Sequence, residues 1–263
     1  MENAYRQPQS VRHNLKFRLL QVKAIADLSP RMRRITLTGE DLADFISASP
    51  DDHVKVFFPK PGESMPVVPE VGPQGPVFPE GAKPIMRDYT PRRYDNAAKE
   101  LDLEFFLHEE GAAAEWARQA QVGQYLGVGG PRGSLVVPYD FDWYLMVGDE
   151  CAIPSFARRL AELPANTAAL VFIEIGHESE KRDFESQANV TVKWVSRETR
   201  PAGDSSLLKE TLLRSNFPHG EYFSWIATEL QCSKEIKELL ETVRGANPEW
   251  IKATGYWKKG ASH

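Results

Sequence analysis

The first half of the chain alternates short, apolar-rich runs with polar turns, which is the pattern of β-strands. Each run is rich in branched and aromatic residues, and the runs occupy residues 16–29, 31–39, 53–59 and 101–108. No extended helical pattern separates them before residue 111. Strands that follow one another without helices between them favour an antiparallel barrel or sandwich.

The second half has a different pattern, in which the apolar runs are continuous and helix-like stretches lie between them. Such runs are typical of strands covered on both faces, and we expect strands over 143–147, 168–175, 190–196 and 222–228. Helices are expected over 153–163, 179–186, 204–216 and 233–244. This alternation predicts a doubly wound parallel sheet. With a boundary near Pro138, the predicted domains span residues 1–138 and 139–263.

A proline-rich segment interrupts the first half. Eight of the chain's 19 prolines lie between Pro59 and Pro84, together with several glycines. Proline has no backbone N–H group, so this segment is neither a helix nor a central strand. We interpret it as a long loop, which is either a functional lid or a disordered insertion.

Composition and charge narrow the class of protein. Of the 263 residues, 41% are hydrophobic and 26% are charged, a globular balance at a length typical of two domains. The formal net charge of −5 argues against a nucleic-acid binder. There is no apolar run of about 18 residues to span a membrane and no apolar signal core. Two cysteines, Cys151 and Cys232, give no disulfide framework or metal site, so we expect a cytoplasmic protein.

Residues 87–95, RDYTPRRYD, combine an aromatic ring, a hydroxyl group and several cations. This mixture suits a flat, redox-active ring with a phosphate tail. Tyr89 can cover a ring face, Thr90 can hydrogen-bond a ring edge, and Arg92 can bind phosphate as a planar fork. Pro91 favours an extended backbone at Thr90. The alternative is a surface strand with salt bridges.

Two further segments are candidates for phosphate contacts. Residues 111–114, GAAA, open a helix whose free amide groups and dipole favour an anion, although alanines also simply make a good helix. Residues 129–134, GGPRGS, form a glycine-rich turn, which suits either a close backbone approach to a ligand or a barrel corner.

A candidate nucleotide site follows the first strand of the expected parallel sheet. Ligands of open α/β sheets bind at the carboxyl ends of the strands, which points to Asp149, Glu150 and Cys151. Arg197 follows the strand 190–196 and is either a ligand for an adenosine phosphate or an exposed loop arginine. The fingerprint GxGxxG of dinucleotide-binding domains is absent, and Cys151 is either near a nicotinamide or a small filler.

Taken in order, these segments resemble the siderophore-interacting protein family, flavin-dependent ferric-siderophore reductases related to ferredoxin-NADP reductases. The resemblance runs from about Phe17 to Gly260. It rests on HVKVFFP, the proline-rich insertion, RDYTPRRYD, FFLHEEGAAAEWA, GGPRGS, VGDECAIPS, WIATE and GYWKKG. The order of so many segments is far more specific than any one of them. It implies a β + α/β protein with an N-terminal antiparallel six-stranded flavin-binding barrel followed by a doubly wound nucleotide-binding domain.

The resemblance also implies roles for particular residues. The residues expected to bind FAD are Arg87, Tyr89, Thr90, Arg92, His108, Ala112, Ala113, Ala114, Trp116, Arg132, Gly133 and Ser134. The reductant side would include Asp149, Glu150 and Arg197. Many ferric siderophores are anionic, and the residues expected to bind the substrate are Lys55, Arg132, Lys252, Lys258 and Lys259. Solvated surface lysines are the alternative for this last group.

The chain also departs from the family pattern in two places. Cys151 replaces a threonine after Gly-Asp-Glu, and Thr228 replaces a glycine in the segment Ala227–Glu229. The pair of arginines that follows in many relatives is absent here. These changes put a preference for NADPH in doubt, so NADH and a reduced ferredoxin stay open as electron donors.

The implied reaction is the one-electron reduction of siderophore-bound Fe(III) by FAD, with no catalytic side chain and no protein metal site. Fe(II) binds hard oxygen ligands less tightly, so reduction releases the metal. One alternative is a general FAD-dependent NAD(P)H oxidoreductase with a protein or quinone acceptor. Another is a siderophore-binding module without a redox role. We expect a monomer without nucleic-acid or membrane partners.

Overall fold

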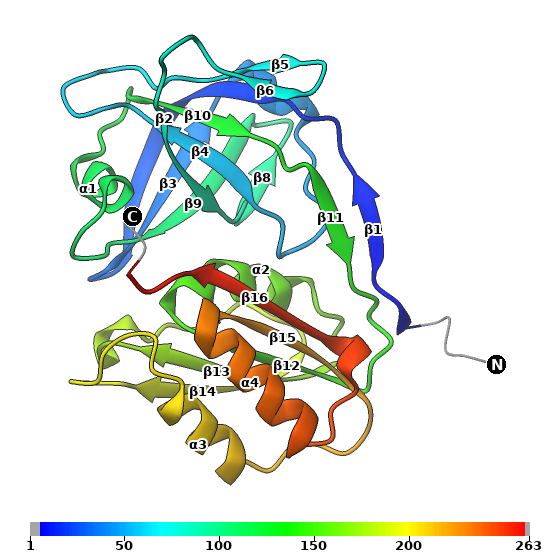
Figure 1. The fold of residues 1–263 in the computed structure, drawn as a ribbon. Coiled ribbons are helices and arrows are strands. Elements are labelled where there is room, and N and C mark those ends of the chain that lie inside the picture. Colours follow the sequence, from blue (N-terminus) through cyan, green and yellow to red (C-terminus); the bar gives the residue numbers. More distant parts are fainter. Residues whose placement is uncertain (1–5, 261–263) are drawn as a thin grey trace. The chain divides into compact units, whose positions relative to one another are not determined.

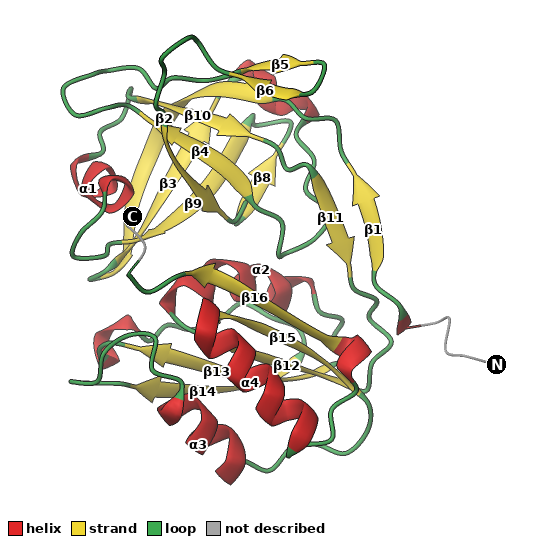
Figure 2. Cartoon of the chain, viewed as in Figure 1, coloured by secondary structure: helices red, strands yellow, loops and turns green. Residues whose placement is uncertain are grey.

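The computed structural model describes residues 6–260, which divide into two compact units (Figure 1). One unit comprises residues 8–136, and the other comprises residues 137–260 together with Arg6 and Gln7. Figure 2 shows that strands dominate the first unit, whereas helices and strands alternate in the second. The division falls two residues before the domain boundary predicted from the sequence.

The first unit is built on a curled, seven-stranded antiparallel sheet in the order β7-β4-β10-β2-β3-β9-β8. Its strands are β2 (Phe17–Ser29), β3 (Met32–Thr38), β4 (Val54–Phe58), β7 (Ile85–Tyr89), β8 (Arg93–Asp95), β9 (Glu100–Phe106) and β10 (Tyr125–Gly129). We call it the barrel unit. The predicted antiparallel flavin-domain fold is confirmed, with one strand more than the six expected. One of its edge strands, β8, has only three residues.

Alternation along the strands places the core of the barrel unit on one face of the sheet. Ile35 of β3 lies opposite Leu103 of β9, and Leu37 lies opposite Leu101; all four side chains are buried. The burial of each such side chain stabilises the fold by about 1.5–3 kcal/mol. Helix α1 (Ala112–Gln119) packs against this core through Ala113 and Ala117.

The segment that contains RDYTPRRYD links the two edges of this sheet. β7 lies at one edge and β8 at the other, and Pro91 stands between them. A proline cannot donate a ladder hydrogen bond, so the chain leaves the first edge here. The backbone N–H group of Arg92 then donates to Asp102 O at 2.9 Å, beside β9.

The proline-rich insertion is partly ordered as a small hairpin. It contains β5 (Glu70–Gly72) and β6 (Gly75–Val77), which pair antiparallel. Phe78 after the hairpin contacts the ring of Phe57 with centroids 6.1 Å apart. The other residues of the insertion form loops, as predicted.

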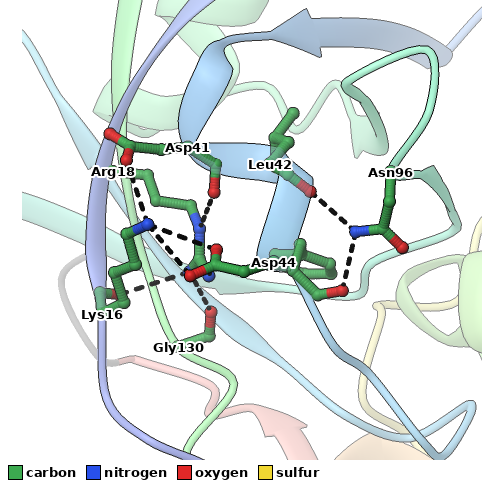
Figure 3. A network of polar contacts seen from close by, with 8 residues as sticks. Lys16, Arg18, Asp41, Leu42, Asp44, Asn96 and Gly130 are labelled. Carbon is green, nitrogen blue, oxygen red and sulfur yellow. Dashed lines mark hydrogen bonds and ion pairs between the residues drawn. The ribbon is translucent and has the colours of Figure 1, made fainter.

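Polar contacts fix the glycine-rich turn to the beginning of β2 (Figure 3). Arg18 donates from Nη1 to Gly130 O at 3.1 Å and from Nε to Asp41 O at 2.9 Å, and its side chain is only 5% exposed. Asp44 accepts from both Arg18 and Lys16. Asp41 and Asp44 belong to the 3-10 helix η2 (Glu40–Asp44). These contacts hold the chain just before Arg132.

Two further strands form a separate ribbon in the barrel unit. β1 (Gln9–Arg12) pairs antiparallel with β11 (Gly133–Val136). A Cβ atom on Gly133 would lie 2.7 Å from Val11 O, so the close pairing of the two strands requires glycine there.

The second unit is built on a five-stranded parallel sheet in the order β14-β13-β12-β15-β16, which confirms the predicted fold class. Its strands are β12 (Trp143–Gly148), β13 (Ala168–Ile175), β14 (Asn189–Ser196), β15 (Tyr222–Glu229) and β16 (Ile251–Trp257). The helices are α2 (Ile153–Glu162), α3 (Ser206–Arg214) and α4 (Leu230–Thr242), with 3-10 turns η3 (Glu150–Ala152), η4 (Glu178–Glu180) and η5 (Pro248–Trp250). We call it the parallel-sheet unit.

Two expectations for this unit were wrong. The stretch 179–186 is not an α-helix, because only η4 forms there and Phe184, its one apolar residue, stacks on Trp194 instead of an apolar helix face. Residues 251–257 are not a tail, because they form the edge strand β16 beside β15. Within residues 6–260, no helix is long and apolar enough to cross a membrane.

Candidate flavin and nucleotide sites

The predicted aromatic residues of the barrel unit lie in one cluster. The ring of Tyr89, at the end of β7, lies 4.3 Å from that of Phe105. Trp116 of α1 contacts Phe105 and Phe58 with centroid distances of 6.2 and 5.6 Å. The structure therefore brings Tyr89 and Trp116 together around the same two phenylalanines, although 26 residues separate them in the sequence.

The beginning of α1 is an uncapped helix terminus. Its N-cap residue is Gly111, with φ at 114°, a conformation that favours glycine. Among residues 6–260, no side-chain hydrogen bond caps this terminus. The first amide groups of a helix have no partner within the helix, and the helix dipole gives them a partial positive charge. Residues 112–114 therefore offer amide donors suited to a phosphate group.

A pocket of about 1000 Å³ runs along one face of α1, from Ala112 in its first turn to Gln119 at its end. One wall is α1 itself, with Ala112, Glu115 and Trp116, and Ile85 of β7 lies beside it. The loop 59–65 and the segment 121–125 supply the other walls. The beginning of the proline-rich insertion thus lines a space that reaches Ala112 in the first turn of α1. Sequence reasoning did not find this role for the loop.

Arg87 and Arg92, the two predicted FAD ligands in the segment RDYTPRRYD, differ in their surroundings. Arg87 Nη1 donates to the carbonyl of the neighbouring Met86 at 2.7 Å. Arg92 Nε lies 3.6 Å from a carboxylate oxygen of Glu104, whose side chain is fully buried. Arg34 of β3 binds the same carboxylate at 2.7 Å. Sequence reasoning missed Arg34 and Glu104, because their pairing across β3 and β9 depends on strand register.

The structure shows internal contacts for some of the predicted residues around the glycine-rich turn. Ser134 Oγ donates to Asp52 at 2.6 Å, accepts from the Ala48 amide at 3.1 Å, and lies 2.7 Å from His13 Nε2. This hydroxyl group is therefore committed to a buried network. Arg132 is exposed, and His108 makes an edge contact with Phe106 at 4.7 Å. Contacts of Thr90, His108, Arg132 and Gly133 with a flavin stay predictions.

These groups fit FAD. The uncapped helix terminus suits a diphosphate, the adjoining pocket has room for a nucleotide portion, and Arg87 supplies a cation on the neighbouring strand. FAD supplies two-electron and one-electron redox chemistry when it is bound.

In the parallel-sheet unit, Asp149 is buried and fully hydrogen-bonded. It accepts from Cys151 N at 3.0 Å, Thr228 Oγ1 at 2.8 Å and Trp257 Nε1 at 2.7 Å. Burial raises the pKa of Asp149, and these three donors oppose that effect. Through these hydrogen bonds the Asp149 carboxylate connects the ends of β12, β15 and β16 and so stabilises the fold.

Glu150 and Arg197 also pair with groups of their own unit. Arg197 Nη1 lies 2.7 Å from Glu150 Oε1 and 3.7 Å from Glu174 Oε1, and all three side chains are at most 10% exposed. Glu150 also accepts from the amide of Gly176 at 2.6 Å. Burial raises the pKa of Glu150, and it raises that of Glu174 to about 8. The expected reductant residues are therefore brought together, but as an internal network.

The two departures from the family pattern have structural consequences. Thr228 fills the position of the expected glycine and binds Asp149 through its hydroxyl group. Burial raises the pKa of the Cys151 thiol well above its usual value, so this group is a neutral thiol and not a reactive thiolate. This favours the interpretation of Cys151 as a small filler.

The basic residues expected to bind the substrate are divided between the units. In the barrel unit, Lys55 pairs with Asp88 across β4 and β7 at 2.5 Å. In the parallel-sheet unit, Lys258 and Lys259 are exposed. Lys252 lies on β16, and burial lowers the pKa of its ammonium group to about 8. It is not the tail residue that the sequence predicted. Among residues 6–260, no group of three or more His, Cys, Asp or Glu side chains is arranged to hold a metal.

Comparisons with known proteins cover nearly the whole chain. Residues 21–135 match the siderophore-interacting FAD-binding domain, and residues 141–260 match the siderophore-interacting protein family. The NADPH-dependent ferric-chelate reductase of Escherichia coli is 38% identical over 98% of this chain and 99% of its own length. Ferric vibriobactin reductase of Vibrio cholerae is 31% identical over 92% and 90%.

A solved structure gives the same result. A siderophore utilization protein from T. fusca is 34% identical, with a TM-score of 0.90 over 97% of this chain and 98% of that one. The sequence match, the two consecutive domain matches and the fold agree along the chain. The chain therefore belongs to the siderophore-interacting protein family.

Proposed function

We propose that this protein is a flavin-dependent reductase of ferric siderophores, which passes single electrons from FAD to Fe(III) and so releases Fe(II). The observation that carries the proposal is the near full-length similarity to the ferric-chelate reductase of E. coli. The uncapped α1 terminus and its pocket support it, because they provide a place for the flavin nucleotide. Iron is the substrate here, held by its siderophore.

The protein has a limited task in this reaction, namely to bind and position the flavin. The amide groups at the beginning of α1 and the guanidinium group of Arg87 would neutralise the diphosphate. Tyr89, Phe58, Phe105 and Trp116 form an aromatic cluster to which α1 contributes Trp116. Fe(II) has a lower charge than Fe(III) and binds oxygen ligands less tightly, so a single electron suffices to release it.

The test is the visible spectrum of the purified full-length protein under anaerobic conditions. We expect a flavin spectrum that NADPH or NADH bleaches and that a ferric siderophore restores. A colourless protein that no added FAD converts to a flavoprotein would contradict the proposal. Bleaching without reoxidation by any ferric chelate, but with reoxidation by a quinone or a protein, would favour a general oxidoreductase instead. Reduction by ferredoxin alone would identify that protein as the electron donor.

We further propose that exposed cations guide anionic substrates. Arg132, Lys258 and Lys259 are exposed, whereas Lys55 is partly neutralised by Asp88 and Lys252 is half-buried. Lys258→Ala with Lys259→Ala should raise the KM for an anionic ferric chelate and leave the reduction of a neutral chelate unchanged. The control is Lys181→Ala, which removes an exposed lysine that pairs with Glu178. An equal loss for both chelates would exclude this role.

We also propose that the protein is a cytoplasmic monomer. Both cysteines, Cys151 and Cys232, are free, as is usual in a reducing compartment. Size-exclusion chromatography with light scattering would test the oligomeric state. Fractionation of cells that produce the protein would test its location. A stable dimer or a membrane-bound fraction would contradict them.

A further inference from the structure

Three loops meet at the carboxyl edge of the parallel sheet, where ligands of such sheets bind. Glu150 follows β12, Gly176 follows β13, and Arg197 follows β14. Arg197 lies between the carboxylates of Glu150 and Glu174, at 2.7 and 3.7 Å. We call Glu150, Glu174, Gly176 and Arg197 the Arg197 clamp.

Gly176 makes room for this arrangement. A Cβ atom at this position would lie 2.9 Å from Arg197 Nη2 and 3.4 Å from Arg197 Cζ. The same atom would lie 3.4 Å from Glu150 Oε1. The absence of a side chain thus lets the guanidinium group fold down over the loop. The atoms in the way are the flexible end of Arg197, so alanine at position 176 would push that end outward while the backbone stays in place.

Electrostatics also retain Arg197 in this position. Glu150 is the nearer of the two acidic partners and is itself buried, so moving Arg197 outward leaves the Glu150 carboxylate without a counter-charge. The hydrogen bonding of the arginine is nevertheless incomplete, because Nη1 has no aligned hydrogen-bond acceptor among residues 6–260. The ion pair and the space above Gly176 therefore hold the guanidinium group of Arg197 in place, and hydrogen bonds contribute less to holding it.

We propose that the Arg197 clamp keeps this arginine retracted, so that the donor site gains little affinity from a 2′-phosphate on the adenosine of its electron donor. Glu150, Glu174 and Gly176 are then specificity-determining residues, and phosphorylated and unphosphorylated nicotinamide dinucleotides are accepted similarly. This inference rests on the proposed function, because it concerns the donor of that reaction. It replaces the expectation that Arg197 itself binds an adenosine phosphate.

The test measures binding directly, by titration calorimetry of the full-length protein with 2′,5′-ADP and with 5′-AMP. We expect the wild-type protein to bind both within about threefold of each other. Gly176→Ala should tighten the binding of 2′,5′-ADP about fivefold or more, since a displaced guanidinium group makes a charge-assisted contact with phosphate. Its affinity for 5′-AMP should stay the same. The double variant Gly176→Ala with Arg197→Gln should lose the gain.

A second variant covers the possibility that Gly176→Ala does not fold. Glu150→Gln removes the charge nearest to Arg197 without a steric change, and it should also tighten 2′,5′-ADP selectively. The inference is overturned if wild-type protein binds 2′,5′-ADP tenfold more tightly than 5′-AMP and Arg197→Gln abolishes the difference. It is also overturned if neither releasing variant changes the ratio, or if neither binds the fragments.

A failure of this binding test can be distinguished from a failure of the proposed reductase function. In a separate experiment, the flavin of the wild-type protein is reduced with dithionite and the excess dithionite is removed. No nucleotide is then needed as the electron donor. Reoxidation of the flavin by a ferric siderophore tests the reductase function alone. A failure of that reaction would leave the binding result for the clamp unaffected.

Discussion

The barrel unit and the parallel-sheet unit differ in what folding leaves available at their candidate sites. In the barrel unit, the first turn of α1 has no side-chain cap and Ala112 lines a pocket. In the parallel-sheet unit, Asp149, Glu150 and Arg197 are buried and paired with one another or with neighbouring residues. Groups at similarly suggestive sequence positions are thus left available in one unit and paired within the protein in the other.

The difference has a physical origin. A helix terminus retains free amide groups after folding, because the helix itself cannot satisfy them. Carboxylates at the ends of buried strands lose their water and need partners from the protein. The barrel unit can therefore present donors to a ligand at no cost to its fold. The parallel-sheet unit uses its polar residues first to satisfy one another.

The largest expected effect tests the structural role of Asp149. Asp149→Ala removes the acceptor of three hydrogen bonds that join β12, β15 and β16. We expect the free energy of unfolding to fall by about 3 kcal/mol, because buried donors are left unsatisfied. Urea denaturation of the full-length protein measures it. Thr228→Val removes only one donor and should cost about 1 kcal/mol. A change below 1 kcal/mol for Asp149→Ala would assign the residue to ligand binding instead.

The second prediction concerns pH. The pKa of Glu174 is raised to about 8, mainly by burial, while Arg197 opposes this effect and Asp149, Glu150 and Asp204 add to it. The folded state therefore binds this proton more tightly than the unfolded state. Its contribution to stability is fully present below about pH 4.5 and is lost as the pH rises towards 8.

Glu174→Gln should remove this pH dependence. We expect the variant to be more stable than the wild-type protein by about 2 kcal/mol at pH 9, and the difference should shrink towards pH 5. Thermal denaturation between pH 5 and 9 measures it. Glu178→Gln, on the neighbouring exposed turn, is the control and should follow the wild-type curve. If the stability of Glu174→Gln differs from that of the wild-type protein by the same amount at every pH, the effect is not due to the titration of Glu174.

The third prediction tests the open site of the barrel unit. Arg87→Ala should weaken FAD binding about 30-fold, equivalent to about 2 kcal/mol, because a charge-assisted hydrogen bond is lost. The stability of the flavin-free protein should be unchanged, since Arg87 donates only to the adjacent Met86 carbonyl among the described residues. Fluorescence titration with FAD measures the affinity. Arg118→Ala, at the exposed end of α1, is the control, and an equal effect there would indicate a nonspecific loss of charge.

The smallest expected effect distinguishes binding from folding most directly. Ala112→Asp places a carboxylate in the first turn of α1, where it should stabilise the helix by about 0.5 kcal/mol and repel a diphosphate. We expect higher thermal stability of the flavin-free protein together with about tenfold weaker FAD binding. Ala112→Asn has a similar shape without the charge and should retain the affinity. If thermal stability and FAD affinity both rise or both fall in Ala112→Asp, the phosphate does not bind at this helix terminus.

Local patterns in the sequence predicted most of the fold. Alternating apolar positions such as Leu101, Leu103 and Phe105 fixed the strands of the barrel unit, and the continuous run 168–175 indicated a buried parallel strand. The helix expected over 179–186 was wrong, because charged residues favoured by helices do not form one without an apolar face to bury. The edge strand β16 was missed because the basic residues after it suggested a tail.

The candidate flavin site was predicted in part. The small residues after Gly111 indicated an anion site, and the structure places them at an uncapped terminus. The pocket wall formed by residues 59–65 was not predictable, since a loop that is rich in proline gives no periodic signal. Arg34, which pairs with Glu104 beside Arg92, could be found only from the register of β3 and β9.

The sequence by itself determined the two fold types and the family, because these depend on local periodicity and on the order of motifs. Only the tertiary structure decided which polar residues remain available to a ligand. Arg197 has the same sequence context whether it is extended or retracted. Its place between Glu150 and Glu174 is set by residues at or just beyond the ends of three strands, which approach one another only when the parallel sheet forms.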